Sequence, residues 1–240
     1  CRPRSCASRF PAWLRRSAPN RARVASSLPK VRRRELRLPK RWPQSARHRK
    51  AKRAGRGMRI VGGERRGMVL RAPTGTATRP TSDRARQALF DMLLHAPWGG
   101  RSLIEGAAVL DAFAGTGALG LEALSRGAAH ASFMERHGAA RAIIGLNLAA
   151  ARFSEQARVM SCDVLRPLRT AAPMQLVFLD PPYGEGFVPR AIVALRRAGW
   201  IGPETVIVAE TGADEPPLDV ETPLACRRFG AATVTIWHAG

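Results

Sequence analysis

The segment Leu179-Asp180-Pro181-Pro182-Tyr183 carries the most distinctive chemistry in the chain. Its two prolines remove two backbone donors and fix the chain direction, which exposes a carbonyl beside the Asp180 carboxylate. Such an acceptor pair suits an exocyclic amine on a planar base, and the aromatic ring of Tyr183 could stack on that base. The alternative is a rigid Asp-Pro turn covered by an aromatic side chain. The position of the segment at the end of a predicted strand favours base binding.

A glycine-rich loop lies upstream, in Asp111-Ala-Phe-Ala-Gly-Thr-Gly. Gly115 and Gly117 would let the backbone turn sharply and approach a ligand, while the following helix would present free N–H groups. Strand–Gly-x-Gly–helix patterns occur in many nucleotide-binding folds, so the loop predicts a nucleotide-like ligand without identifying it.

Two acidic residues follow at the ends of the next strands. Glu135 lies twenty residues after Gly115, where a carboxylate can accept hydrogen bonds from both hydroxyls of a ribose. The alternative for Glu135 is an ordinary polar strand end. Asp163 could accept a hydrogen bond from an adenine amino group, or it could cap the next turn. Together they favour an adenosine-containing cofactor, whether a dinucleotide or another one.

Strand-like and helix-like runs alternate around these residues. The strand candidates are 108–113, 131–135, 157–161, 176–180 and 205–210, and the helix candidates are 119–126, 138–151 and 189–198. A final pair, 225–229 and 232–237, predicts a hairpin around Gly230. Buried apolar strands that alternate with helices predict an α/β, doubly wound, Rossmann-like sheet that is mainly parallel, and the hairpin would add an antiparallel strand.

A basic region precedes this pattern. Residues 59–61 and 68–70 flank a Gly-rich turn, which predicts a hairpin. Ser82 or Asp83 can cap a helix whose apolar residues recur at helical spacing. We predict that the arginines of these two elements contact phosphates, although a solvated edge is the alternative; they are Arg59, Arg65, Arg66, Arg84 and Arg86.

Charge divides the 240-residue chain unevenly, although its formal net charge is +22. Residues 1–57 hold 20 Lys and Arg against one acid, whereas residues 58–240 hold 20 Arg and 17 acids. The composition of residues 1–57 predicts disorder. They could be an RNA-binding arm, an organelle transit peptide, or a stretch outside the working protein. We favour the last, because the regular pattern begins abruptly at Met58.

Several function classes are excluded or disfavoured by composition. No apolar run approaches the ~18 residues of a membrane-spanning helix, which excludes an integral membrane protein. The four cysteines show neither paired zinc spacing nor a disulfide framework. Cys162 and Cys226 lie in apolar strand-like stretches, so we expect buried reduced thiols and a cytoplasmic location. The histidines lack ligand-like partners, so we expect no metal site.

Asp111–Gly117 and Asp180–Tyr183, in this order, resemble class I S-adenosylmethionine-dependent amino-methyltransferases. More closely, residues 58–240 resemble the RsmD family, which methylates the exocyclic N2 of a guanine in small-subunit (16S) ribosomal RNA. The stretches that carry this resemblance are 58–63, 79–86, 110–128, 147–148, 179–183 and 227–230. Their combination is specific, although no single stretch is. Residues 1–57 have no counterpart in the family, and Arg replaces every Lys in the basic hairpin.

The resemblance implies a seven-stranded methyltransferase domain over 99–240, an RNA-contacting module over 58–98, and a basic extension over 1–57. It implies S-adenosylmethionine as cofactor and small-subunit ribosomal RNA, free or within an assembly particle, as partner. The implied cofactor residues are Asp111, Phe113, Gly115, Thr116, Gly117, Glu135 and Asp163. The implied guanine-binding and catalytic residues are Asp180, Pro181, Pro182 and Tyr183. Hydrogen bonds from N2 to Asp180 and the Pro181 carbonyl would aim the amine at the methyl group.

Other functions share parts of this pattern. A DNA amino-methyltransferase acting on adenine N6 or cytosine N4 would use the same acceptor–Pro-Pro–aromatic segment, and a protein glutamine methyltransferase could use a similar one. DNA enzymes commonly carry an extra target-recognition region, for which residues 58–240 leave little room. An RNA-binding factor without catalysis, or an NAD-dependent dehydrogenase, leaves Asp180–Tyr183 unexplained.

Overall fold

The computed structural model describes residues 57–72, 82–220 and 222–240. These residues all belong to one structural unit, 51–240. The expectations for residues 1–56 and for the stretch 79–81 lie outside the described residues, and the division of the chain at 57/58 and 98/99 stays a prediction.

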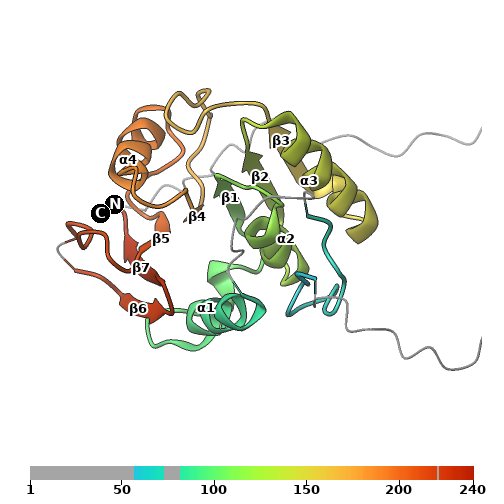
Figure 1. The fold of residues 1–240 in the computed structure, drawn as a ribbon, viewed down its shortest axis with the longest axis horizontal. Helices are drawn as coiled ribbons and strands as arrows, with labels where there is room; N and C mark the ends of the chain where they lie inside the picture. Colours follow the sequence, from blue (N-terminus) through green and yellow to red (C-terminus); the bar gives the residue numbers. More distant parts are fainter. Residues whose placement is uncertain (1–56, 73–81, 221) are drawn as a thin grey trace, which may run out of the picture. The chain divides into compact units, whose positions relative to one another are not determined.

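Among the described residues, seven strands form one sheet in the order β3-β2-β1-β4-β5-β7-β6 (Figure 1). Their bounds are β1 (Ala108–Ala112), β2 (His130–Met134), β3 (Ala157–Met160), β4 (Leu176–Leu179), β5 (Val206–Gly212), β6 (Ala225–Phe229) and β7 (Ala232–His238). Strands β1 to β5 are parallel, and β7 runs antiparallel to both β5 and β6. The predicted mainly parallel sheet with a terminal antiparallel hairpin is therefore confirmed.

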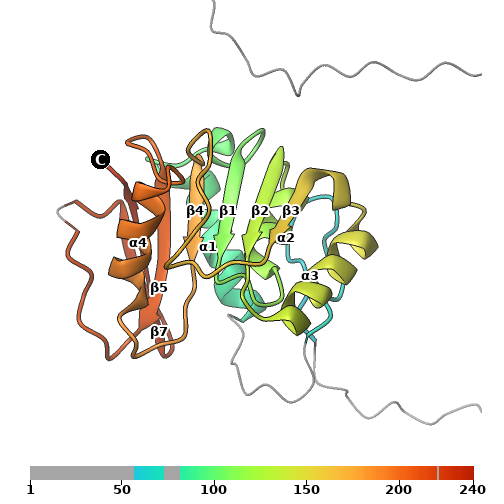
Figure 2. The same cartoon turned by 90° about the horizontal axis from the view of Figure 1, so that it is seen from above.

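Helices cover both faces of this sheet. The α-helices are α1 (Asp83–His95), α2 (Ala118–Ser125), α3 (Gly138–Ala151) and α4 (Phe187–Arg197), and the short 3-10 turns are η3 (Arg101–Leu103) and η4 (Ser154–Gln156). Figure 2 shows α4 and α1 on opposite sides of the strands. No helix in the described part of the chain is long and apolar enough to span a membrane.

Alternate residues along each strand build two hydrophobic cores, because successive side chains of a strand point to opposite faces. Val109, Phe178 and Val208 pack with α1, α2 and α3 on one face. Leu110 and Val177 pack with α4 on the other. Both faces are covered, which is why these strands are almost continuously apolar.

One local expectation is confirmed and one needs correction. The predicted N-terminal hairpin is present in a short form, with an antiparallel bridge between Arg59 and Val69 and backbone hydrogen bonds from Ile60 to Met68 and from Leu70 to Met58. Cys226 was expected to be buried but is exposed, since β6 is the edge strand and is covered less than the centre of the sheet. Cys162 is half-buried, and both thiols are free.

A buried carboxylate links the N-terminal segment 57–72 to helices α1 and α2. Glu122 of α2 is fully buried, and its Oε1 accepts a hydrogen bond from Nε of Arg126 at 2.8 Å. Its Oε2 accepts from the backbone N–H of Val61 at 2.7 Å, and Nε of Arg86 lies 3.8 Å from the same oxygen. The Arg126 guanidinium also lies 5.0 Å from the ring centre of Phe90. One side chain therefore joins α1, α2 and the 57–72 segment.

We predict that Glu122→Ala lowers the free energy of unfolding by about 3–5 kcal/mol, because it leaves a buried arginine without its counter-charge. The matched control is Glu105→Ala, which removes an exposed ion pair with Arg101 and should change stability by about 0–1 kcal/mol. Urea unfolding of both variants provides the measurement. Equal losses in the two variants would show that Glu122 is not a structural anchor.

Candidate active site

The register of the parallel strands aligns the predicted site residues at one edge of the sheet. The last residue of β1 pairs with the last residues of both β2 and β4. Phe113, Glu135 and Asp180 therefore follow their strands at the same level. Strand β3 ends beside β2, which brings Asp163 to this edge as well. In open α/β sheets, ligands bind outside the carboxyl ends of the strands.

The glycine loop has left-handed backbone at Phe113 (φ 63°), Gly115 (φ 53°) and Gly117 (φ 78°). A Cβ on Gly117 would lie 3.2 Å from the ring of Phe133 and 3.3 Å from Ile144. A side chain at Gly117 would therefore be crowded at the start of α2, and its left-handed backbone favours glycine as well. A Cβ on Gly115 would meet nothing closer than 3.9 Å, so this glycine leaves one side of the loop open.

Glu135 supports the glycine loop. Its Oε2 accepts a hydrogen bond from the N–H of Gly115 at 2.9 Å, and its Oε1 accepts from the N–H of His137 at 2.7 Å. A carboxylate can accept about four hydrogen bonds, so Glu135 retains acceptor capacity for the hydroxyls of a ribose. The residue is 7% exposed. Glu135 thus fixes the glycine loop and can still accept hydrogen bonds from ribose hydroxyls, as predicted from its position in the sequence.

Asp111 lies beneath the loop. Its Oδ2 accepts a hydrogen bond from the N–H of Gly120 at 2.8 Å, which fixes the first turn of α2 against β1. Burial raises the pKa of the Asp111 carboxyl to about 7; the hydrogen bond from Gly120 opposes the rise, and the charge of Glu135 adds to it. The structure gives Asp111 a positioning role, and a direct cofactor contact stays a prediction.

Asn147 belongs to a stretch that carries the family resemblance but had no predicted role, and it holds the far end of the loop. Its Nδ2 donates to the carbonyls of Thr116 and Arg71, both at 3.1 Å. Its Oδ1 accepts from the N–H of Arg71 at 2.8 Å. Asn147 is 1% exposed on a helix face that also carries buried Ile144 and Leu148. A lone amide at apolar helical spacing is the signal that could have indicated this role.

Asp163 is exposed, and its Oδ1 accepts a hydrogen bond from the N–H of Leu165 at 2.9 Å. The capping alternative is therefore confirmed. Contact with an adenine amino group stays a prediction, because the second oxygen of the carboxylate could still accept.

Two glutamates hold the Asp180–Tyr183 segment at the end of β4. The Tyr183 hydroxyl donates a hydrogen bond to Oε1 of Glu210 on β5, although the residue remains 45% exposed. The N–H of Gly184 donates to Oε1 of Glu215 at 3.0 Å. Burial raises the pKa of Tyr183, and the hydrogen bond to Glu210 raises it further, so the phenol stays protonated. Neither glutamate was predicted to contact this segment, because nothing in the local sequence links them to it.

An aromatic contact joins the two loops. Phe113, which follows β1, lies 5.7 Å from Phe187 between ring centres, with the rings tilted by 46°. Phe187 begins α4, four residues after Tyr183. Such tilted aromatic pairs are favourable. The contact therefore connects the glycine loop with the segment predicted to bind the base.

The five predicted phosphate-binding arginines have different environments. Arg66 and Arg84 are exposed, whereas Arg59 and Arg65 are half-buried. The guanidinium of Arg65 lies 5.6 Å from the ring centre of Phe153 and pairs with Glu64.

Arg86 requires a correction. It is 1% exposed, forms an ion pair with Asp83 at 2.9 Å and donates a hydrogen bond to the carbonyl of Arg59. Its guanidinium is therefore not accessible to a phosphate in this structure. Its spacing from buried Leu89, Phe90 and Leu93 places it on the core face of α1, a signal that was available in the sequence.

The strand order, with a glycine loop after β1 and Asp-Pro-Pro-Tyr after β4, defines a class I methyltransferase. The RNA methyltransferase of Salinibacter ruber, solved with S-adenosyl-L-homocysteine, shares this fold: TM-score 0.50, 15% identity, 66% of this chain and 92% of that chain. The model of the family described as Conserved hypothetical protein 95 matches residues 58–238. The chain belongs to this family, the RsmD family.

Individual relatives agree with this assignment. Ribosomal RNA small subunit methyltransferase D of Escherichia coli strain K12 is 40% identical over 155 residues, which cover 64% of this chain and 74% of the relative. The enzyme of the same name from Haemophilus influenzae is 35% identical over 168 residues, covering 68% and 83%. The solved structure of the Escherichia coli protein yhhF aligns with a TM-score of 0.62 and 34% identity, covering 75% of this chain and 97% of that chain.

We predict that Asp111→Asn changes how stability depends on pH. The pKa of Asp111 is raised in the folded protein to about 7, from 3.8, so its contribution is favourable below pH 4 and is lost as pH rises to 7. Relative to the wild type, the variant should therefore gain about 4 kcal/mol between pH 4 and pH 7. Urea unfolding at several pH values measures this, and parallel curves for the two proteins would contradict the assignment.

Proposed function

We propose that this methyltransferase modifies the exocyclic N2 amine of a guanine in small-subunit ribosomal RNA. The observation that carries the proposal is the Asp180–Tyr183 segment, held at the carboxyl edge of the sheet beside the glycine loop. The names of the relatives, ribosomal RNA small subunit methyltransferase D, support the RNA substrate. Within this proposal, residues 58–98 contact RNA, residues 99–240 perform the transfer, and the enzyme acts in the cytoplasm, on free RNA or an assembly particle.

The residues around the glycine loop fit S-adenosylmethionine. Glu135 keeps acceptor capacity for ribose hydroxyls, and the open side of Gly115 allows close approach to the backbone. Phe113, Thr116, Gly117 and Asp163 belong to the same edge of the sheet, and Asp111 fixes the first turn of α2, which follows the loop. When bound, the cofactor supplies an electrophilic methyl group on its sulfonium.

The guanine amine is a weak nucleophile, because its lone pair is delocalised into the ring. Hydrogen bonds from N2 to the Asp180 carboxylate and the Pro181 carbonyl would localise that pair on nitrogen and orient it. The N–C bond would form as the S–C bond breaks, and the amine proton would leave to Asp180 or to water. Pro181 and Pro182 fix the acceptors, so much of the acceleration comes from orientation.

Tyr183 provides a platform for the base. Its hydroxyl is held by Glu210, which fixes the orientation of the ring, while nearly half of the side chain stays exposed. An exposed aromatic face can stack on a base that has left an RNA helix or loop. A guanine that must reach Asp180 has to be splayed out in this way.

We predict that Asp180→Asn lowers kcat for methyl transfer by about 100-fold or more, because the amide accepts hydrogen bonds less strongly and takes up no proton. Asp219→Asn, a change at an exposed acid outside the proposed site, should retain wild-type activity. The assay follows transfer of labelled methyl from S-adenosylmethionine to unmethylated small-subunit RNA, with DNA and protein as alternative acceptors. Wild-type activity in Asp180→Asn would refute the site, and labelling of DNA or protein alone would refute the substrate.

We also predict that the double variant Arg66→Glu/Arg84→Glu binds RNA at least about tenfold more weakly at 0.1 M salt, because two exposed cations are reversed. The affinity for S-adenosylmethionine should not change. The control is Arg101→Glu/Arg158→Glu, which reverses two other exposed arginines. Fluorescence anisotropy with labelled RNA measures both variants; equal losses would indicate an effect of net charge alone.

A further inference from the structure

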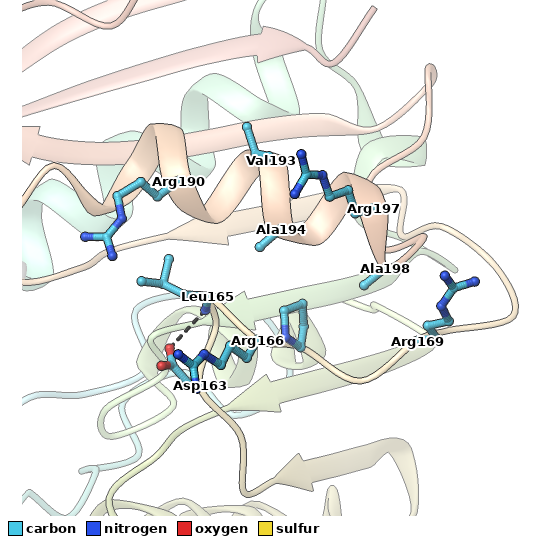
Figure 3. A pocket seen from close by; sticks show the side chains of 10 residues that line it. Asp163, Leu165, Arg166, Arg169, Arg190, Val193, Ala194, Arg197 and Ala198 are labelled. Atoms are coloured by element: carbon cyan, nitrogen blue, oxygen red, sulfur yellow. Dashed lines mark hydrogen bonds between the residues drawn. The ribbon is translucent and has the colours of Figure 1, made fainter.

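A second basic site lies on the opposite face of the sheet from α1. The loop after β3 and the helix α4 enclose an open hollow of about 590 Å³ (Figure 3). Four arginines line it: Arg166, Arg169, Arg190 and Arg197. Asp163 is the one acidic residue among the described residues that line the hollow, and its Oδ1 accepts a hydrogen bond from the N–H of Leu165.

Among the described residues, the four arginines of this hollow face a single lining acid, Asp163. In the part of the chain that the structure describes, the side chains of Arg166, Arg169 and Arg197 form no hydrogen bond or ion pair. All four arginines are exposed. Cations gathered around a concave surface raise the local concentration of an anionic ligand. The hollow therefore has the electrostatic character of an anion-binding site.

The arginines are spread too widely for a single phosphate group. Arg190 and Arg197 are seven residues apart on α4, which corresponds to about 10 Å along the helix. Figure 3 shows Arg190 near the end of the hollow that holds Asp163, and Arg197 near the end that holds Arg169. A stacked nucleic-acid strand carries about one phosphate per 3.4 Å of its axis. At this spacing, about 10 Å of strand carries roughly three successive phosphates. Guanidinium groups can bind phosphates in a bidentate manner.

One end of the hollow adjoins the proposed active site. The guanidinium of Arg190 lies 5.6 Å from the ring centre of Phe187, and Phe187 contacts Phe113 of the glycine loop. Asp163 belongs both to the hollow and to the proposed cofactor residues. A strand in the hollow would therefore lead toward the carboxyl edge of the sheet.

We propose that this arginine-lined hollow binds the phosphate backbone of the substrate RNA, on the side of the target guanine away from α1. This inference rests on the proposed function, because it takes the bound polyanion to be the RNA that is methylated. It adds a contact surface that is separate from Arg66 and Arg84, since α4 and α1 pack on opposite faces of the sheet.

The test uses the full-length triple variant Arg166→Gln/Arg169→Gln/Arg197→Gln, which leaves Arg190 on Phe187. RNA affinity should fall about tenfold or more at 0.1 M salt. The slope of log Kd against the logarithm of the salt concentration should decrease by about two to three. Each phosphate contact that is lost lowers this slope by roughly one. In the methylation assay, KM for RNA should rise while kcat and the affinity for S-adenosylmethionine stay unchanged. The probe is a labelled, unmodified small-subunit RNA transcript.

The matched control is Arg101→Gln/Arg158→Gln/Arg227→Gln, which removes three exposed arginines outside the hollow. An equal change of slope in both triple variants would overturn the proposal, as would a wild-type slope and KM in the hollow variant. Weaker binding to ribosomal assembly particles, with protein-free RNA bound normally, would also overturn it by indicating a protein partner. Absence of methyl transfer by the wild type would refute the proposed function instead, and the salt dependence of RNA binding would still be measurable.

Discussion

The arrangement of the N-terminal segment depends on the interactions of one fully buried carboxylate, that of Glu122. It accepts the N–H of Val61 and a hydrogen bond from Arg126, and it lies beside the guanidinium of Arg86. Burying a carboxylate is costly unless cations and donors surround it, so these partners must adopt their positions together. The same helix α2 begins at the glycine loop, which ties the position of the 57–72 segment to that of the proposed cofactor site.

Carboxylates near the carboxyl edge of the sheet fix the backbone by accepting N–H groups. Asp111 accepts from Gly120 in the first turn of α2, Glu135 accepts from Gly115 in the glycine loop, and Glu215 accepts from Gly184 after β4. A site that must orient a weak nucleophile needs loops that do not reorganise during the reaction. These acids therefore contribute through the geometry of the backbone, whereas Asp180 is the acid proposed to meet the substrate.

The strands and helices were predictable wherever apolar periodicity was strong: α3 and β6 have the predicted bounds, and the other elements differ by a few residues at their ends. The sheet edge that carries the site followed from the same pattern. The roles of Glu210 and Glu215 were not predictable, because their partners lie about 30 residues away and meet them only through the pairing of β4 with β5. The predicted phosphate contact of Arg86 was wrong for a different reason. The prediction rested on the charge of Arg86, whereas its position on the apolar face of α1 buries it.

Arginine counts are consequently a poor guide to where RNA would bind on this protein. Arg86 and Arg126 neutralise Glu122, and Arg65 packs on Phe153, so part of the positive charge near the N-terminal segment is used internally. The arginines along α4 and the loop before β4 have no such internal use in the described structure, apart from Arg190 on Phe187 and Arg196 at the Ala239 carbonyl. An RNA that contacts both groups of exposed arginines and also reaches the proposed site would pass the carboxyl edge of the sheet, where Asp180 and Tyr183 follow β4.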